Sequence, residues 1–250
     1  MALPLFGFVA VHQRPLVDGV AFEASWLAQV AATGRPTAQL WQSSAGFVVP
    51  RSYVRRERWS EACLASAAEG WPVQVRSSGG GLVPQGPGLW NLSLAWPAPG
   101  DSPAGMEAIY RALADELAAA LARLGVTAAA QAVEGSFCDG RFNLAVDGRK
   151  LVGTAQAWRR IAGRYVTLAH AVIVVTAEPA ALVAAANRFE ERSGGAARYR
   201  TDALTSLADA WRAAHDGAPP PADLEQRLLT AIAERFARVA PPNVRAPVAA

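Results

Sequence analysis

The amino-acid sequence predicts an α+β fold in which helices flank a mixed, largely antiparallel sheet. Short apolar runs follow one another several at a time before a helix intervenes, unlike the regular alternation of a βαβ winding. An Asp147-Gly148 pair between two apolar runs is a strong signal for a type I′ turn, and therefore for an antiparallel hairpin. No G-x-G-x-x-G follows a strand and no G-x-x-x-x-G-K-[ST] occurs, so Rossmann and P-loop folds lack their motifs.

The N-terminal part combines short strands with two helices. Asp18 is a suitable N-cap for the first helix, which Gly34 ends. The second helix is expected over residues 57–68 and ends at Gly70. Strands are expected at residues 5–11, 38–41, 47–49, 73–76 and 91–96, with a loop at 97–103.

The C-terminal part begins with the clearest helix. Over residues 109–121 an isoleucine or leucine recurs at every fourth position, and Gly125 supplies the stop. The Asp-Gly hairpin follows, and then a long buried strand at 165–176. Residues 179–239 are expected to be helical, with an interruption at the Gly- and Pro-rich segment 217–221.

Composition excludes several classes of protein. The chain has 250 residues, of which 52% are hydrophobic and 18% charged, so it is not a disordered chain. No apolar run reaches the ~18–20 residues of a membrane span, and no basic segment precedes the apolar start as in a signal peptide. Two cysteines are too few for a disulfide framework. We therefore expect a cytoplasmic protein.

The positive charge is carried almost entirely by arginine. The net charge is +3, and Lys150 is the one lysine among 24 basic residues. The arginines are scattered without interleaved aromatic residues, so we expect neither a nucleic-acid nor a membrane partner. A lysine that persists in such a sequence points to a role that needs a compact ammonium group.

Two segments carry candidate chemistry. The first, RSSGGGLV from Arg76, has three consecutive glycines directly after a strand, where backbone N–H groups are able to cradle an oxygen atom. A flexible linker is the alternative interpretation. The second runs from Gly135 to Gln156 and contains Cys138 and Lys150, and a thiol near an ammonium is favoured as a thiolate nucleophile. A half-buried loop cysteine without a catalytic role is the alternative for Cys138, whereas Cys63 fits the apolar side of a helix.

These two segments, in this order, resemble the motifs of the biotin/lipoate protein ligase superfamily. Its members carry an R-R-x-S/T-G-G-G-A-V loop followed by a G-R-K-(I/V)-x-G-(S/T)-A-Q strand, which RSSGGGLV and GRKLVGTAQ match closely. The similarity extends over residues 15–210. The resemblance implies a mixed sheet with flanking helices, an acyl chain held beside the glycine loop, and contact between Lys150 and the acyl carbonyl or its adenylate phosphate.

The resemblance also implies a division of the chain and a set of partners. Residues 1–178 correspond to the catalytic core, and 179–250 form a C-terminal helical segment packed on it, with a frayed tail after Val239. The implied partners are lipoyl-carrier domains, either the glycine-cleavage H protein or the E2 component of 2-oxoacid dehydrogenases, and an acyl donor protein. Lipoate or octanoate is the transferred group.

Within this superfamily, ATP-dependent ligases differ from ATP-independent transferases. One group of transferases forms a thioester on a cysteine in an S-Y-C-x-G-x-Y-D-L motif, which SFCDGRFNL resembles. This favours a transferase with Cys138 as nucleophile. The alternative is a lipoate-protein ligase that uses ATP and magnesium and binds lipoyl-AMP through Lys150. A non-catalytic binder of lipoylated domains is a further alternative. A biotin ligase is disfavoured because the sequence lacks the basic glycine-arginine loop of that branch.

The sequence departs from the superfamily pattern at two places. The histidine that usually ends the glycine loop is replaced within GLVPQGPG, and the ligase G-R-N-D becomes Gly140-Arg141-Phe142-Asn143. His170 matches a histidine of related strands, but a histidine satisfied by its neighbours is the simpler interpretation. No metal-ligand set is predicted. Cys138 and Lys150 are the expected catalytic residues, and the expected acyl- or adenylate-binding residues are Arg76, Ser77, Ser78, Gly79, Gly80, Gly81, Leu82, Gly153, Thr154 and Ala155.

Overall fold

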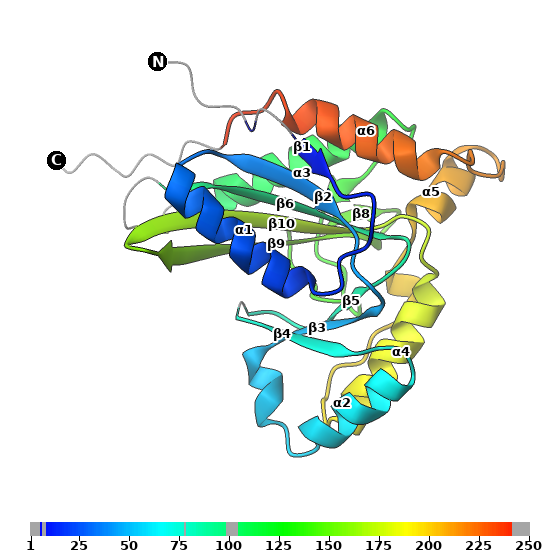
Figure 1. Cartoon of the computed structure of the whole chain (residues 1–250). Coiled ribbons are helices and arrows are strands. Elements are labelled where there is room, and N and C mark those ends of the chain that lie inside the picture. Colours follow the sequence, from blue (N-terminus) through cyan, green and yellow to red (C-terminus); the bar gives the residue numbers. More distant parts are fainter. Residues whose placement is uncertain (1–5, 7–8, 78, 99–104, 242–250) are drawn as a thin grey trace.

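Two sheets and their flanking helices make up the computed structural model, which describes residues 6, 9–77, 79–98 and 105–241 (Figure 1). The expected first strand and the expected loop at 97–103 lie partly outside the described residues, and so does most of the tail after Val239. In the described part, no helix is both long and apolar enough to cross a membrane.

The larger sheet has seven strands and is antiparallel except at one edge. The parallel edge is formed by the first two strands in the chain, and the longest strands are the antiparallel pair at residues 149–161 and 164–174. This confirms the predicted mixed, largely antiparallel sheet. Asp147 and Gly148 both have positive φ (48° and 74°) at the two-residue turn, as a type I′ hairpin requires. The strand order is β1 (Val9–Val11), β2 (Thr37–Trp41), β6 (Leu89–Pro97), β10 (Arg164–Val174), β9 (Arg149–Ile161), β8 (Leu144–Val146) and β7 (Ala129–Ala130).

A second, three-stranded sheet was not anticipated. It consists of β4 (Val73–Arg76), β3 (Gly46–Pro50) and β5 (Val83–Gln85), with β3 in the centre. The chain passes from it into β6 through Gly86 and Gly88, both with positive φ. Strands this short carry too few residues for a period-two pattern to show which sheet they join.

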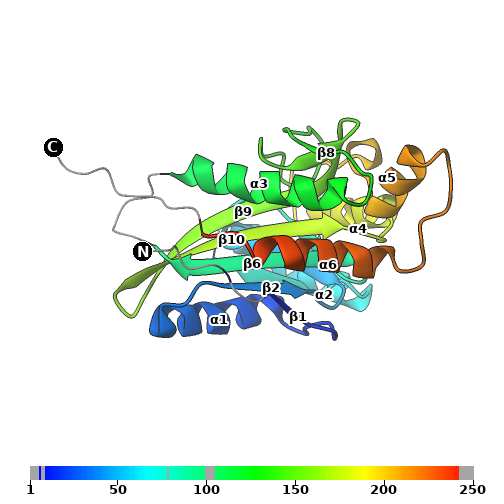
Figure 2. The same cartoon turned by 90° about the horizontal axis from the view of Figure 1, so that it is seen from above.

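Helices cover both faces of the larger sheet (Figure 2). On one face, α3 (Met106–Ala122) and α6 (Leu224–Phe236) share a core with the inward side chains of β6 and β10. On the other, α1 (Gly19–Thr33) packs its Trp26 and Val30 against a smaller cluster. As predicted, Asp18 caps α1 through a bond from the Ala21 N–H, and Gly34 ends it with φ 68°.

Three further helical segments pack on the smaller sheet and share a separate core with it. They are the 3₁₀ turn η1 (Arg51–Arg55), α2 (Trp59–Ala68) and α4 (Pro179–Arg192). After α4, the prediction of continuous helix up to residue 217 is wrong. Residues 193–206 form no α-helix and contain only the 3₁₀ turn η2 (Thr201–Ala203), because Gly194 ends α4 with φ 77° and Ser206 caps α5 (Leu207–Ala214).

Candidate active site

Cys138 lies in the loop between β7 and β8, and its side chain is exposed. Its φ is +58°, a left-handed conformation that costs about 1–3 kcal/mol for a residue with a side chain. Its backbone carbonyl accepts three hydrogen bonds, from Gly140 N–H (2.9 Å), Asn143 Nδ2 (2.7 Å) and Lys150 Nζ (2.9 Å). Three donors therefore hold the backbone of the residue that bears the thiol.

Lys150 is buried, with 5% of its surface exposed, at the start of β9. Its ammonium donates to the carbonyl oxygens of Phe137 and Cys138. Gly153 leaves room for the side chain, since a Cβ there would lie 3.2 Å from Nζ. Burial lowers the pKa of Lys150 to about 8, although the nearby Cys138 and Asp139 act in the opposite direction. Lys150 is thus a compact donor that also exchanges its proton near neutral pH.

The glycine loop is tied to the Cys138 loop through one arginine and one amide. The Arg76 guanidinium donates to the carbonyls of Gly79 (2.9 Å) and Gly81 (2.6 Å), which folds the loop back on β4. The Gly81 N–H then points at Cys138 Sγ, 3.4 Å away. At Gly80, φ is +95° and a Cβ would lie 3.1 Å from the same sulfur, so glycine is required there. The two sequence motifs, 57 residues apart, therefore meet at one sulfur atom.

The other residues predicted to bind the acyl group or adenylate differ in their exposure and in the element on which they lie. Gly153 and Ala155 alternate with Thr154, whose hydroxyl donates to the Phe142 carbonyl (2.9 Å). Ala155 and Ser77 are exposed, whereas the Leu82 side chain is fully buried in the core of the smaller sheet. Ser78 lies outside the described residues.

Two contributors were not foreseen as part of the site. Asn143, which is 1% exposed, bridges Cys138 and β9. The segment after α4 returns along the start of β9, where Thr205 N–H donates to the Lys150 carbonyl (3.0 Å). The sequence signal for Asn143 is its place inside the cysteine motif. The segment 193–206 has no sequence signal that points to the site.

His170 and Cys63 have the environments that the sequence predicted. The ring of His170 contacts Glu23 Oε1 (2.6 Å) and Asn91 Oδ1 (3.1 Å), so both its nitrogens have partners. Burial raises the pKa of Glu23, but His170 and Ser93 outweigh this and hold it below its usual value. Cys63 is half-buried in α2, and burial raises the pKa of its thiol. Neither group contacts the Cys138 sulfur.

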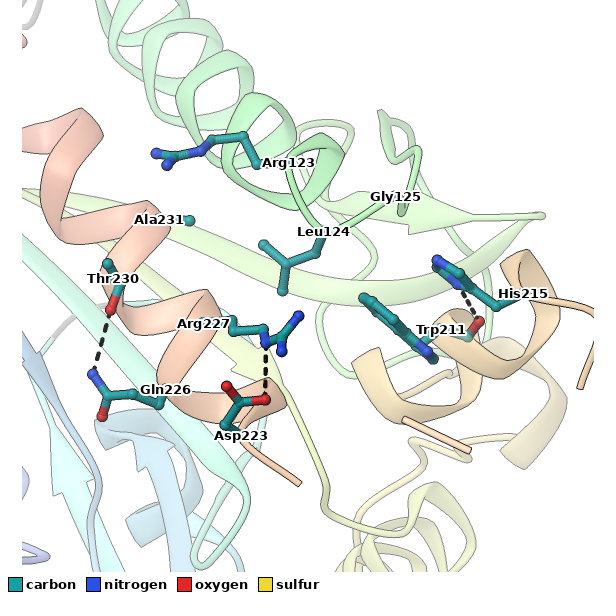
Figure 3. A pocket seen from close by; sticks show the side chains of 10 residues that line it. All are labelled: Arg123, Leu124, Gly125, Trp211, His215, Asp223, Gln226, Arg227, Thr230 and Ala231. Atoms are coloured by element: carbon teal, nitrogen blue, oxygen red, sulfur yellow. Dashed lines mark hydrogen bonds and ion pairs between the residues drawn. The ribbon is translucent and has the colours of Figure 1, made fainter. Parts of the chain in front are cut away.

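Two pockets are lined by residues other than the expected catalytic pair. One, of about 550 Å³, lies between the end of α3 and helices α5 and α6, where Trp211 stacks on His215 (Figure 3). The other, of about 510 Å³, is lined by α3 residues, Gly140 and Thr154. Neither is lined by Cys138 or Lys150. Within the described residues, no group of three His, Cys, Asp or Glu side chains is placed to hold a metal ion.

Comparison with known proteins places the chain in a family. Residues 17–233 match the family model described as the lipoyl protein ligase A/B catalytic domain. An octanoyl-[GcvH]:protein N-octanoyltransferase of Kyrpidia tusciae is 35% identical over 80% of this chain and 71% of its own length. An uncharacterised protein of Cupriavidus necator is 40% identical over 91% of this chain and 93% of its own.

Solved structures agree at the level of the fold. A T. acidophilum protein with bound lipoic acid superposes with a TM-score of 0.61 at 16% identity, covering 92% of this chain and 86% of that one. Lipoate-protein ligase A bound with ATP gives a TM-score of 0.57 at 14% identity, covering 93% and 96%. Motifs, fold and family model agree, and the chain belongs to the lipoyl protein ligase A/B catalytic domain family.

Proposed function

We propose that this protein transfers an octanoyl or lipoyl group to a lysine of a lipoyl-carrier domain through a thioester on Cys138. The observation that carries the proposal is the exposed Cys138 thiol with a backbone donor, Gly81 N–H, at 3.4 Å. A donor at this place stabilises negative charge on the sulfur. It also lies close to where the acyl oxygen becomes negative when the carbonyl is attacked.

The proposed reaction has two steps. The Cys138 thiolate attacks the acyl carbonyl of an octanoylated carrier, a C–S bond forms, the amide C–N bond breaks, and the donor lysine leaves as an amine after gaining a proton. An acceptor lysine amine then attacks the thioester, a new C–N bond forms as the C–S bond breaks, the acceptor nitrogen gives up the proton that the first step consumed, and the thiolate is regenerated. By analogy with the K. tusciae relative, the donor is an octanoylated GcvH-type carrier. A free thiol nucleophile needs reducing surroundings, so we propose the cytoplasm as the place of action.

The second candidate is an ATP-dependent lipoate ligase, which the structural likeness to lipoate-protein ligase A keeps open at the level of fold. In that case Lys150 would hold the lipoyl-adenylate and Cys138 would have no covalent role. The Lys150 ammonium and the Gly81 N–H, both at the Cys138 loop, are donors of the kind that suits a phosphate.

Intact-mass spectrometry separates the two candidates. The protein is mixed with octanoylated GcvH without ATP, alongside Cys138→Ser and the matched control Cys63→Ser. The proposal expects an octanoyl adduct on the parent and on Cys63→Ser that hydroxylamine removes, and none on Cys138→Ser. Absence of the adduct, together with lipoyl-adenylate formation from lipoate, ATP and magnesium, would establish the ligase. If neither reaction occurs but the protein still binds lipoylated carrier, it is a non-catalytic binder.

A further inference from the structure

Asn143 is a buried polar side chain whose two ends are both bonded to backbone groups of the site. Its Nδ2 donates to the Cys138 carbonyl (2.7 Å), and its Oδ1 accepts from the Thr154 N–H (3.0 Å). It immediately precedes β8, five residues after the cysteine. One side chain therefore connects the Cys138 loop to β9.

The strand pairing explains why this bond is available. The strand β8 ends its pairing with β9 at Leu144 and Val152, where the register also shifts. Thr154 lies two residues farther along β9, beyond the last paired residue, so β8 offers no backbone carbonyl to its N–H. The carboxamide oxygen of Asn143 accepts the hydrogen bond from the Thr154 N–H instead of a backbone carbonyl. A side chain thus adds one more hydrogen bond to the pairing between this segment and β9.

The other end of the carboxamide acts on the strained residue. Cys138 has φ +58°, and three donors hold its carbonyl. The Gly140 N–H is part of the same tight turn, and the Lys150 ammonium is shared between the carbonyls of Phe137 and Cys138. Asn143 is short, buried and bonded at both ends, so it is the donor that best fixes the loop to the sheet.

We propose that Asn143 is a positioning residue, whose carboxamide holds Cys138 in the left-handed conformation that keeps Sγ at the Gly81 N–H. This inference rests on the proposed function, since it assigns Asn143 a role in forming the Cys138 thioester. It requires a side chain that donates and accepts at once. An aspartate has the same shape but, when ionised, accepts only.

The test compares Asn143→Asp with Asn143→Ala in a Cys63→Ala background. The single-turnover rate of acyl-enzyme formation is measured from pH 4 to 8 with octanoylated GcvH, as a ratio to the parent. At pH 7 we expect Asn143→Asp to be slower by about tenfold or more, with KM for the carrier within about twofold. For Asn143→Asp, the ratio of the variant rate to the parent rate should approach one at low pH, where the protonated aspartic acid regains a hydrogen-bond donor. Asn143→Ala should stay slow at every pH.

A matched control checks that lost stability is not the cause. Asn187 makes the same pair of bonds to the backbone of Tyr199, accepting from its N–H (2.8 Å) and donating to its carbonyl (2.9 Å). Asn187→Asp should lose comparable stability, but its rate ratio should not vary with pH. Iodoacetamide labelling of Cys138 in Asn143→Asp should remain complete, because the thiol stays exposed.

Two results would overturn the inference. A rate for Asn143→Asp within twofold of the parent would do so, as would a loss that is equal at every pH and matches that of Asn187→Asp. Failure of this inference is distinguishable from failure of the proposed function. If Cys138→Ser still transfers octanoyl groups, the thioester route itself is wrong; if only Asn143→Asp behaves like the parent, the route stands without this residue.

Discussion

The ammonium of Lys150 is buried without a carboxylate partner. In the described part of the chain it forms no ion pair and is bound instead by two backbone carbonyls. Burial accordingly lowers its pKa, to about 8 from 10.5. Lys150 therefore holds the two peptide carbonyls on either side of the Cys138 side chain.

This burial predicts a pH dependence of stability. Between pH 8 and 10.5 the unfolded chain holds a proton on Lys150 that the folded chain has released, so the free energy of unfolding rises with pH. Across this window the difference in stability between the parent and Lys150→Met should grow by about 3 kcal/mol in favour of the parent. Urea unfolding at several pH values measures it. A difference that stays flat would show that the lysine is not desolvated.

Replacing Lys150 with arginine tests its shape rather than its charge. A planar guanidinium is too wide for the space over Gly153 and between two carbonyls, so acyl transfer should fall about a hundredfold or more. Arg160→Lys, on the exposed end of the same strand, is the control and should transfer at the parental rate. Parental activity of Lys150→Arg in the carrier acylation assay would contradict the requirement for a compact ammonium.

At the scale of single elements, β9 does most to organise the site. An irregularity in its pairing with β8, between Lys150 and Val152, lets Gly153 lie next to the end of the Lys150 side chain. The hydroxyl of Thr154 donates to the Phe142 carbonyl. The hairpin of β9 with β8 could be predicted because Asp-Gly encodes the turn locally. The path of the segment 193–206 could not be predicted, because it is set by contacts with residues distant in sequence, such as the hydrogen bond from Thr205 N–H to the Lys150 carbonyl.

The glycine of β9 gives a prediction at this scale. In Gly153→Ala the new Cβ would lie 3.1–3.2 Å from the end of the Lys150 side chain, which is flexible and must move aside. We expect transfer to slow about tenfold, while the unfolding free energy changes by no more than about 1 kcal/mol. Transfer assays and urea unfolding measure the two effects. Equal, large losses in both would mean that the strand, not the lysine, had been disturbed.

At the scale of the whole molecule, a buried acid joins the parts that surround the smaller sheet. Glu190 of α4 is completely buried and accepts from Tyr53 (2.6 Å), Tyr199 (3.1 Å) and Arg56 (2.7 Å). Tyr199 in turn packs against Phe137, beside Cys138, with ring centroids 4.6 Å apart. The cluster is thus packed against Phe137, the residue that precedes Cys138.

Removing that acid should be costly. Glu190→Ala leaves two hydroxyls and a guanidinium without their partner, so the free energy of unfolding should fall by about 3–5 kcal/mol. Tyr199→Phe removes one hydrogen bond and keeps the ring packing, and should cost about 1 kcal/mol. Urea titrations compare the two. If both variants lose the same small amount, the cluster is not a structural centre.

The whole-molecule arrangement also shows what sequence could reveal about the site. The glycine loop and the Cys138–Lys150 segment were identified together because their motifs resemble a family in which they act jointly. Their meeting at the sulfur depends on the second sheet and on Arg76, neither of which local pattern could position. Asn143 escaped notice as a site residue because its role appears only when the end of β8 is known.

The central claim is that the acyl group passes through Cys138, and a chase of the acylated protein tests it most directly. The octanoyl form is isolated, freed of donor, and mixed with apo lipoyl domain in the absence of ATP. We expect the octanoyl mass to leave Cys138 at the same rate as it arrives on the acceptor lysine, and at least as fast as overall turnover. Transfer to the carrier while the mass stays on Cys138, or turnover faster than the chase, would contradict it.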